Sequence, residues 1–537
     1  MTGTWRLGTK AVRPGSYYRR SAIGITTESS TNGILACIFR SNFGTLNKVV
    51  DIDQTDMNNL EDLYGDGAAI LREGLIGGAT TIRAIRVGGD DGECSKVTLK
   101  SAATITRTVK LTNLVGDLPD IVAGEGMAVT SGDNTLTLTT DYTVADKKIT
   151  VKSTAAEKVV DDTLTITKTQ TPANAVEIST KYPGDRAFTV SVRTNIINDQ
   201  RQVLIYDGTD IFDAVSFEAS DDEAQSVVDA FALNKNFVAR KLAAAPLEDI
   251  TQTPMTGGSN PTVTNTHYSK GTDLLERFRW NCVVADTDDD GVQAMLISFV
   301  KQSYETGHLG MTCIAGKSTQ DLDDRMKCSA AINDEKVVYL LNGWNGIDGT
   351  VYDGWLAAAR IGGMIANVET NASLTHLVVS NALELIEPLT NGEITRAEQK
   401  GCFVLALNDE DQVIIDNAIT TLVSLGNDMD EGWKKIRRTK CRFELMDRVN
   451  RTCEKIIGRL NNDDNGRATI VAAMQGIINE MVGEHKLFFG SYAEVDPVHA
   501  PEGDYAYFLL HLGDIDSLEK IYLDFRFSFT NPFPIED

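Results

Sequence analysis

The sequence predicts a multidomain α/β and α+β protein with a central, mainly parallel α/β sheet, a Thr-rich all-β insert, and extended N- and C-terminal β arms. Three observations lead to this prediction. Over residues 257–425, apolar runs of strand length alternate with helical segments, as in a parallel sheet with helical crossovers. Within residues 97–181, polar and apolar residues alternate in several segments, and Thr is frequent. The segment 521–530 also alternates, and the chain ends soon after it.

A chain of 537 residues is too long for one hydrophobic core, so three or four folded domains are expected. In chain order we expect an N-terminal extended arm, an α/β segment, the all-β insert, a second α/β segment, a central α/β domain, a C-terminal α+β domain and a C-terminal β arm. These divisions are 1–25, 26–96, 97–181, 182–256, 257–425, 426–513 and 514–537.

Extended and alternating segments are expected in the first third of the chain. Pro14 cannot donate to a strand ladder, so the segment from Val12 to Tyr18 is expected to be an edge-type arm. Strands at 35–40 and 81–87 are expected to flank helices at 57–64 and 67–74. In the insert, alternating Thr and apolar residues predict the strands of a small sandwich or barrel at 135–139, 148–151 and 163–167.

The second half has the most regular pattern. Strands are expected at 280–285, 311–315 and 336–341, and helices at 292–308, 319–331 and 353–368. Strands joined by helical crossovers lie parallel in one sheet. A hairpin is expected between 402–407 and 413–415, followed by helices at 431–460 and 468–484 and a strand at 505–511.

Composition excludes several classes of function. The net charge of −25 argues against binding to nucleic acid or to an anionic membrane. No apolar run has membrane-spanning length, and residues 1–10 lack a signal-peptide core, so folding in a cytoplasm is expected. The eight cysteines are scattered without a Cys-x-x-Cys pair, so we expect reduced thiols, no metal site and no cofactor.

The segment from Asp286 to Gly291 is the most prominent acidic motif. It begins like a calcium loop, but Ile297 stands where an EF-hand needs a bidentate Glu. It also follows a strand, like the nucleophile of an aspartate-dependent phosphatase, with Asp286 attacking and Asp288 acting as acid. No matching lysine motif follows. We therefore expect a solvated turn in which Asp289 or Asp290 caps the next helix, no enzymatic activity, and a phosphatase only as a distant alternative.

The predicted helix 431–460 is basic within an acidic chain. A charge-complementary contact with an acidic tube or a neighbouring subunit is one interpretation, and a solvated helix face is the other. The candidate contact residues are Lys434, Lys435, Arg437 and Arg438.

Several segments in the same order resemble the tail sheath protein of contractile bacteriophage tails, which is also the sheath of phage-tail-like bacteriocins. The resemblance covers most of the chain except the Thr-rich insert. The matching segments are Val12-Arg13-Pro14-Gly15-Ser16-Tyr17, residues 71–82 with Gly77-Gly78, residues 86–89, Lys181-Tyr182-Pro183-Gly184-Asp185-Arg186, Gly257-Gly258, and residues 278–283, 354–368, 401–425 and 514–529.

The resemblance implies a structural subunit that forms hexameric rings stacked around a tail tube and contracts to drive the tube through a target envelope. Each terminal arm would join a sheet in a neighbouring subunit. The implied partners are further copies of the chain, the tail tube protein, and baseplate and tail terminator proteins, in a virion tail assembled in the host bacterial cytoplasm. A genome-free bacteriocin sheath is an alternative, and the Thr-rich region suggests a surface-layer protein or adhesin as a third.

The arms are the candidate subunit-linking sites. Their residues are Val12, Pro14, Gly15, Tyr17, Tyr18, Ile521, Leu523, Phe525, Phe527 and Phe529. Burying each apolar C-terminal side chain gains roughly 1.5–3 kcal/mol. Fixing the backbone costs roughly 1–2 kcal/mol per residue. One arm alone is therefore expected to bind marginally, and both arms together to polymerise cooperatively.

Overall fold

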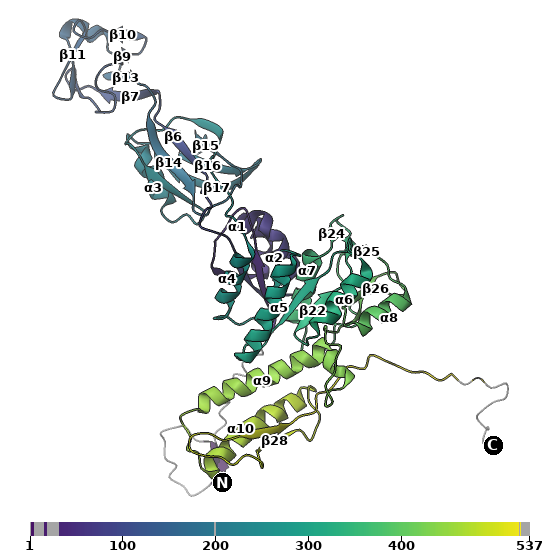
Figure 1. Cartoon of the computed structure of the whole chain (residues 1–537). Coiled ribbons are helices and arrows are strands. Elements are labelled where there is room, and N and C mark those ends of the chain that lie inside the picture. The colour runs from purple at the N-terminus through teal and green to yellow at the C-terminus, as the bar shows by residue number, and fades with distance from the viewer. Residues whose placement is uncertain (1, 5–15, 19–31, 198–199, 526, 528–537) are drawn as a thin grey trace, which may run out of the picture.

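The computed structural model describes residues 2–4, 16–18, 32–197, 200–525 and 527. The protein is elongated, with four bodies in a row (Figure 1). An all-β body lies at one end, followed by a second inserted domain, a central α/β domain and a C-terminal helical domain. The mixed, multidomain α/β class is as predicted. In the described part of the chain, no helix is long and apolar enough to span a membrane.

The central domain is built on a six-stranded sheet. Its strand order is β22-β21-β20-β3-β5-β4, in which only β4 is antiparallel to its neighbour. The strands, in chain order, are β3 (Ile34–Phe39), β4 (Val49–Asp53), β5 (Thr81–Arg86), β20 (Cys282–Ala285), β21 (Met311–Ala315) and β22 (Val337–Leu340). Residues 34–86 therefore share one sheet with residues 282–340, although the sequence divisions placed them in separate segments.

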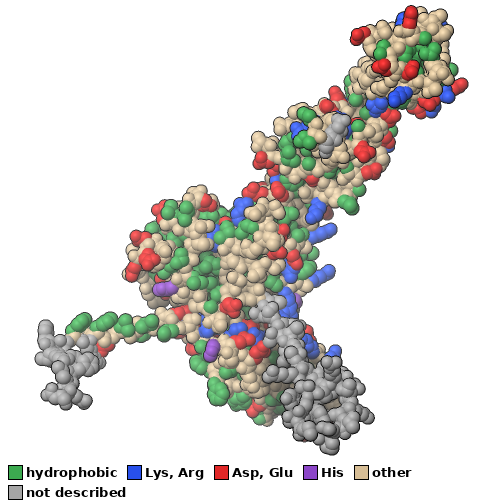
Figure 2. All heavy atoms as spheres, turned by 180° about the vertical axis from the view of Figure 1, so that it is seen from behind, with side chains coloured by type: hydrophobic (Ala, Val, Ile, Leu, Met, Phe, Trp, Pro, Cys, Tyr) green, Lys and Arg blue, Asp and Glu red, His purple; other side chains and the backbone are tan. Residues whose placement is uncertain are grey.

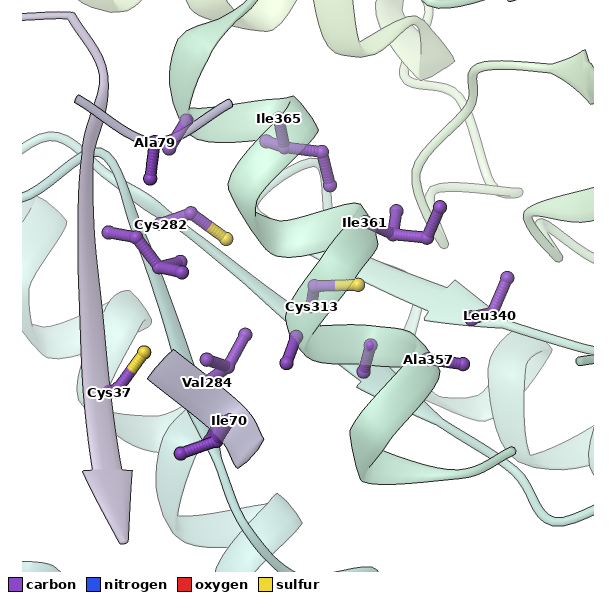
Figure 3. Packing of buried hydrophobic residues seen from close by; sticks show 14 of the residues in the cluster. Cys37, Ile70, Ala79, Cys282, Val284, Cys313, Leu340, Ala357, Ile361 and Ile365 are labelled. Carbon is purple, nitrogen blue, oxygen red and sulfur yellow. The ribbon is translucent and has the colours of Figure 1, made fainter. Parts of the chain in front are cut away.

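Helices cover both faces of this sheet because its strands are apolar on both sides. One face packs against α2 (Ala68–Ile76) and α7 (Trp355–Asn367), and the other against α4 (Asn265–Leu275), α5 (Asp290–Glu305) and α6 (Leu322–Ile332). Figure 3 shows Cys37, Cys282 and Cys313 in the core with α7. Helices α2 and α7 approach so closely that a Cβ on Gly363 would lie 2.3 Å from the Gly74 carbonyl oxygen. All eight cysteines are unpaired thiols.

Smaller elements complete the central domain. Helix α1 (Leu60–Tyr64) lies between two 3₁₀ turns, η1 (Gln54–Asn59) and η2 (Gly65–Gly67). A three-stranded sheet and helix α8 follow the main sheet: β23 (Trp344–Gly346), β24 (Val351–Tyr352), β25 (Ala382–Leu385) and α8 (Asn391–Gln399). The predicted hairpin is confirmed, with β26 (Val404–Leu407) antiparallel to β27 (Val413–Asn417).

The next body is inserted between β5 and α4. It has one helix, α3 (Glu223–Phe231), and two antiparallel sheets with orders β18-β14-β6 and β17-β16-β15-β19. Its strands are β6 (Lys96–Lys100), β14 (Asn174–Thr180), β15 (Phe188–Thr194), β16 (Arg201–Asp207), β17 (Asp210–Phe217), β18 (Phe237–Lys241) and β19 (Ile250–Pro254). The prediction of an α/β segment at 182–256 is therefore wrong, because these strands pair antiparallel.

The Thr-rich body is inserted in turn between β6 and β14. Two antiparallel sheets, β10-β9-β13-β7 and β11-β12-β8, enclose their own core. The strands are β7 (Thr104–Lys110), β8 (Val115–Asp117), β9 (Met127–Ser131), β10 (Asn134–Leu136), β11 (Tyr142–Ala145), β12 (Lys148–Val151) and β13 (Thr163–Thr169), with a 3₁₀ turn η3 (Ser153–Lys158). The predicted boundaries 97 and 181 are too wide, because β6 and β14 close the core of the neighbouring domain.

The C-terminal domain follows a short 3₁₀ turn, η4 (Glu431–Lys434). Two long helices, α9 (Ile436–Ile456) and α10 (Asp464–Gly483), agree with the predicted helical segments. A two-stranded antiparallel sheet, β28 (Tyr492–Val495) with β29 (Phe508–His511), packs against α10. Near the N-terminus, β1 (Thr2–Thr4) pairs in parallel with β2 (Ser16–Tyr18).

Candidate functional site

The C-terminal arm leaves the body as an extended segment. Residues 514–525 and 527 belong to no strand, so the strand predicted from 521 onward is not formed within a single chain over the residues described. Its apolar side chains lie in solvent: Ile521 is 69% exposed, Leu523 71%, Phe525 72% and Phe527 94%. Figures 1 and 2 both show this arm projecting away from the body. A strand needs a partner ladder, and none of the described residues provides one at that place.

The N-terminal arm is described only in part. Tyr17 and Tyr18 lie in β2, whose partner is the strand Thr2–Thr4. Val12, Pro14, Gly15 and, at the other end of the chain, Phe529 lie outside the described residues.

Among the described residues, the sheet β28–β29 has two strands, and neither outer edge pairs with a third strand. The β28 edge is partly covered by α10, because the Ala493 backbone N–H donates to Gln475 Oε1 over 3.1 Å. One face is half-buried or buried against α10 through Ala493, Phe508 and Leu510. On the other face, the Tyr492 and His511 rings stack with centroids 4.4 Å apart. The outer edge of a sheet carries backbone donors and acceptors that can accept another strand.

The basic residues at the start of α9 bind the base of the C-terminal arm. Lys435 Nζ lies 2.8 Å from Asp516 Oδ2 and 2.7 Å from Glu519 Oε2. Arg438 donates to Asp514 Oδ1 over 2.6 Å and also pairs with Asp430. Acidic residues of the arm base thus face basic residues of the helix start.

These contacts correct one sequence prediction. Arg437 is only 6% exposed and Arg438 9%, Arg437 donates to the Ile515 carbonyl oxygen, and Lys434 pairs with Glu431. The four residues Lys434, Lys435, Arg437 and Arg438 therefore do not form an open surface for a tube or a neighbour. Their charges are largely neutralised by acidic and carbonyl groups of the same chain, which the sequence could not place beside them.

Titration behaviour follows from this pairing. The hydrogen bond from Arg438 to Asp514 raises the pKa of the Arg438 guanidinium above its usual range. Burial raises the pKa of Asp514, but the hydrogen bond from Arg438 and the positive charges of Arg438 and Arg442 together outweigh burial and hold that pKa below its ordinary value. Burial lowers the pKa of Lys435, but the bonds to Asp516 and Glu519 outweigh it and raise that pKa. All three groups are therefore charged at neutral pH.

Residues 514–519, here called the anchor segment, are held by two domains. On the C-terminal domain, the Ile515 backbone N–H donates to the Lys486 carbonyl oxygen over 3.0 Å. On the central domain, Ser373 and Thr375 hydroxyls donate to Glu519 Oε1 over 2.9 and 3.2 Å. The anchor segment therefore fixes the point at which the arm leaves the body.

The acidic motif after β20 has a structural role. Asp289 caps α5 by accepting from the backbone N–H groups of Gly291 and Val292, as predicted. The turn is less solvated than expected: Asp286 is buried, accepting from the Arg40 backbone N–H over 2.8 Å and from the Tyr268 hydroxyl. Burial raises the pKa of Asp286, and its hydrogen bonds offset this only in part.

Asp288 accepts from the backbone N–H of Trp355 over 2.6 Å, at the start of α7. The two carboxylates thus link the carboxyl end of β20 to α4, through Tyr268, and to α7, through Trp355. Among the described residues, no group of three or more His, Cys, Asp or Glu side chains is arranged to hold a metal ion.

Comparison with known proteins agrees with this architecture. Residues 262–421 match the family model of the phage tail sheath protein central domain. A sheath tail protein from Desulfitobacterium hafniense aligns with 92% of this chain and 95% of its own at 18% identity and a TM-score of 0.63. One from Listeria innocua aligns with 90% and 94% at 15% identity and a TM-score of 0.58. A search of curated proteins gives no match. Residues 262–421 thus match the phage tail sheath protein central domain, and the chain has the fold of the solved sheath tail proteins.

Proposed function

We propose that this protein is the structural sheath subunit of a contractile tail. Copies would polymerise as stacked hexameric rings around a tail tube, and contraction would drive the tube through the envelope of a target cell. The observation that carries the proposal is the C-terminal arm, an alternating segment whose apolar side chains are exposed while its base is fixed to the body.

The arm is proposed to pair with a neighbouring copy. Strand addition needs an extended segment on one partner and an open sheet edge on the other. Residues 521–525 and 527 supply the first, and β28–β29 supplies the second. Because every copy carries both, pairing between copies produces a continuous mesh. The N-terminal arm, with Tyr17 and Tyr18, is proposed to join the same kind of contact.

The energies favour a cooperative assembly. Burying the four exposed side chains Ile521, Leu523, Phe525 and Phe527 gains roughly 6–12 kcal/mol at roughly 1.5–3 kcal/mol each. Ordering the seven residues 521–527 costs roughly 7–14 kcal/mol at about 1–2 kcal/mol per residue. The sum is near zero, so one arm gives a weak contact. The anchor segment is already ordered in the single chain and adds no further cost, and simultaneous engagement of both arms makes assembly cooperative.

The remaining parts of the proposal follow from the sheath resemblance. The extended sheath would be a metastable state, so contraction would release stored free energy without nucleotide hydrolysis. Its partners would be the tail tube protein, the baseplate and the tail terminator, in a virion tail assembled in the host cytoplasm. A genome-free bacteriocin particle would use the same contacts, so the proposal covers both kinds of particle.

Truncation of the arm tests the proposal. Removing residues 521–537 should leave a folded monomer with unchanged urea unfolding, because the described side chains it removes are exposed. Negative-stain electron microscopy should then show no sheath under conditions in which the full chain forms tubes. If the truncated chain still forms contractile tubes, the proposal fails.

A matched pair of substitutions tests strand pairing itself. Phe525→Asp places a charge on the face expected to contact the partner sheet, whereas Tyr522→Asp places it on the opposite face. We expect assembly to be lost in Phe525→Asp and largely retained in Tyr522→Asp. Equal loss in both would argue against a β-strand contact.

A further inference from the structure

We infer that the anchor segment directs the C-terminal arm away from the sheet of its own subunit and so keeps it available to a neighbour. This inference rests on the proposed function, in which the arm adds to a β28–β29 sheet of another copy. Lys435 and Arg438 would then be positioning residues for the arm.

Self-pairing is the competing arrangement. Every copy presents the same sheet edges, so an arm that suits a neighbour's sheet also suits its own. Strand β29 ends at His511, and the alternating segment begins at Ile521. Hairpin loops of two to five residues suffice to reverse a chain, so the intervening residues are long enough for the arm to return to β29.

Without a restraint, self-pairing would be favoured. An intramolecular partner has an effective concentration on the order of millimolar, above that of a neighbouring copy in dilute solution. A third strand would also add ladder hydrogen bonds to the two-stranded sheet. In a subunit whose arm pairs with its own sheet, the arm could not bind a neighbour, and one sheet edge would no longer be open to a neighbour's arm.

The anchor segment prevents the return by holding the chain in another direction. After β29, Asp514 pairs with Leu487 in an isolated antiparallel bridge and binds Arg438. The chain then passes Lys435, and Glu519 reaches Ser373 in the central domain. The arm consequently emerges on the side of the central domain and points away from the body (Figures 1 and 2).

The restraint depends on a few polar groups. Glu519 alone accepts from Ser373 and Thr375 and pairs with Lys435, and its side chain is 11% exposed. Asp516 provides the second carboxylate for Lys435. Replacing both carboxylates by amides removes the charge from this part of the anchor segment while leaving the apolar cores of both domains intact.

Hydrogen–deuterium exchange on the full-length monomer tests the inference. We compare Asp516→Asn/Glu519→Gln with the unmodified chain and with a control, Asp504→Asn, which removes an exposed carboxylate elsewhere in the C-terminal domain. In the unmodified chain and the control, amides of residues 521–527 should exchange rapidly. In the double variant, they should exchange at least tenfold more slowly, together with those of β29, and sheath formation should fall.

Two results would overturn the inference. The first is a loss of exchange protection in the anchor segment of the double variant while residues 521–527 still exchange as rapidly as in the unmodified chain. The second is unchanged exchange protection of the anchor segment in the double variant. A charge-swapped variant, Lys435→Glu/Asp516→Lys/Glu519→Lys, should restore rapid exchange in the arm. These measurements use the monomer, so they are separate from the arm truncation that tests the proposed function.

Discussion

Phe43 provides the sharpest test of how the inserted domain is joined to the central domain. It lies in the loop after β3 of the central sheet, yet its ring is 1% exposed and belongs to the core of the inserted domain. Its ring centroid is 5.4 Å from that of Phe188 and 5.8 Å from that of Tyr182. The Arg186 guanidinium lies 5.4 Å from the same ring centroid.

The expected magnitude for Phe43→Ala follows from this burial. Removing a buried Phe side chain costs about 3–5 kcal/mol through lost transfer free energy and the remaining cavity. Arg186 also loses one aromatic partner, although it keeps Phe188, Phe212 and the carboxylate of Asp207. We expect a loss of about 3–4 kcal/mol in the free energy of opening of the inserted domain.

Native-state hydrogen exchange can assign this loss to a domain. Amides of β15 and β16 report on the inserted domain, and those of β20 and β21 on the central sheet. Phe43→Ala should lower the free energy of opening measured at β15 and β16, and should change that measured at β20 and β21 by less than about 0.5 kcal/mol. The control is Phe278→Ala, a surface ring under Arg83 in the central domain, expected to cost less than about 1 kcal/mol. A loss below about 1 kcal/mol for Phe43→Ala, or equal losses in both domains, would refute the reasoning.

Three further predictions concern stability. A chain that lacks residues 514–537 should have a free energy of unfolding about 2–4 kcal/mol lower than a chain that lacks only 521–537. The reason is that Arg438 stays buried but loses its ion pair with Asp514. Coincident urea unfolding curves for the two truncated chains would contradict this. Burial and then Asp416 raise the pKa of Glu398 to about 7, so the stability that protonation of Glu398 contributes is complete below about pH 4.5 and is lost as pH rises through 7. Glu398→Gln should therefore stabilise the fold by about 1 kcal/mol at pH 8 and not at pH 4, a value reduced for partial exposure. Asp286→Ala should cost about 2–3 kcal/mol in thermal unfolding, because the Tyr268 hydroxyl and the Arg40 amide lose their acceptor; an unchanged Tm would exclude this role.

Local signals in the sequence were sufficient for many elements. Apolar runs bounded by turn residues located β21 and the hairpin β26–β27, since a strand buried on both faces must be apolar throughout. The helix cap was narrowed to Asp289 or Asp290, because a capping side chain needs only the amides that follow it in the chain, and the structure shows that Asp289 is the cap. Such features depend on neighbours in sequence, so one chain is enough to predict them.

Features that depend on distant partners could not be predicted in this way. The alternation of β6 and β14 resembles that of the Thr-rich strands, and only the pairing of β14 with β18 shows that they belong to the neighbouring domain. The positive charges of Lys435 and Arg438 were evident from the sequence, but no local pattern placed residues 514–519 beside them.

By itself, the sequence determined the mixed fold class, most strands and helices, and an apolar terminal segment without an obvious partner. These depend on side-chain periodicity, which is a local property. The tertiary structure decided that one sheet joins residues 34–86 to 282–340, that the insertions are nested, and that the basic start of α9 anchors the arm. Those outcomes depend on which buried charges and open strands meet across long separations in the chain, and that is set by the packing of the whole molecule.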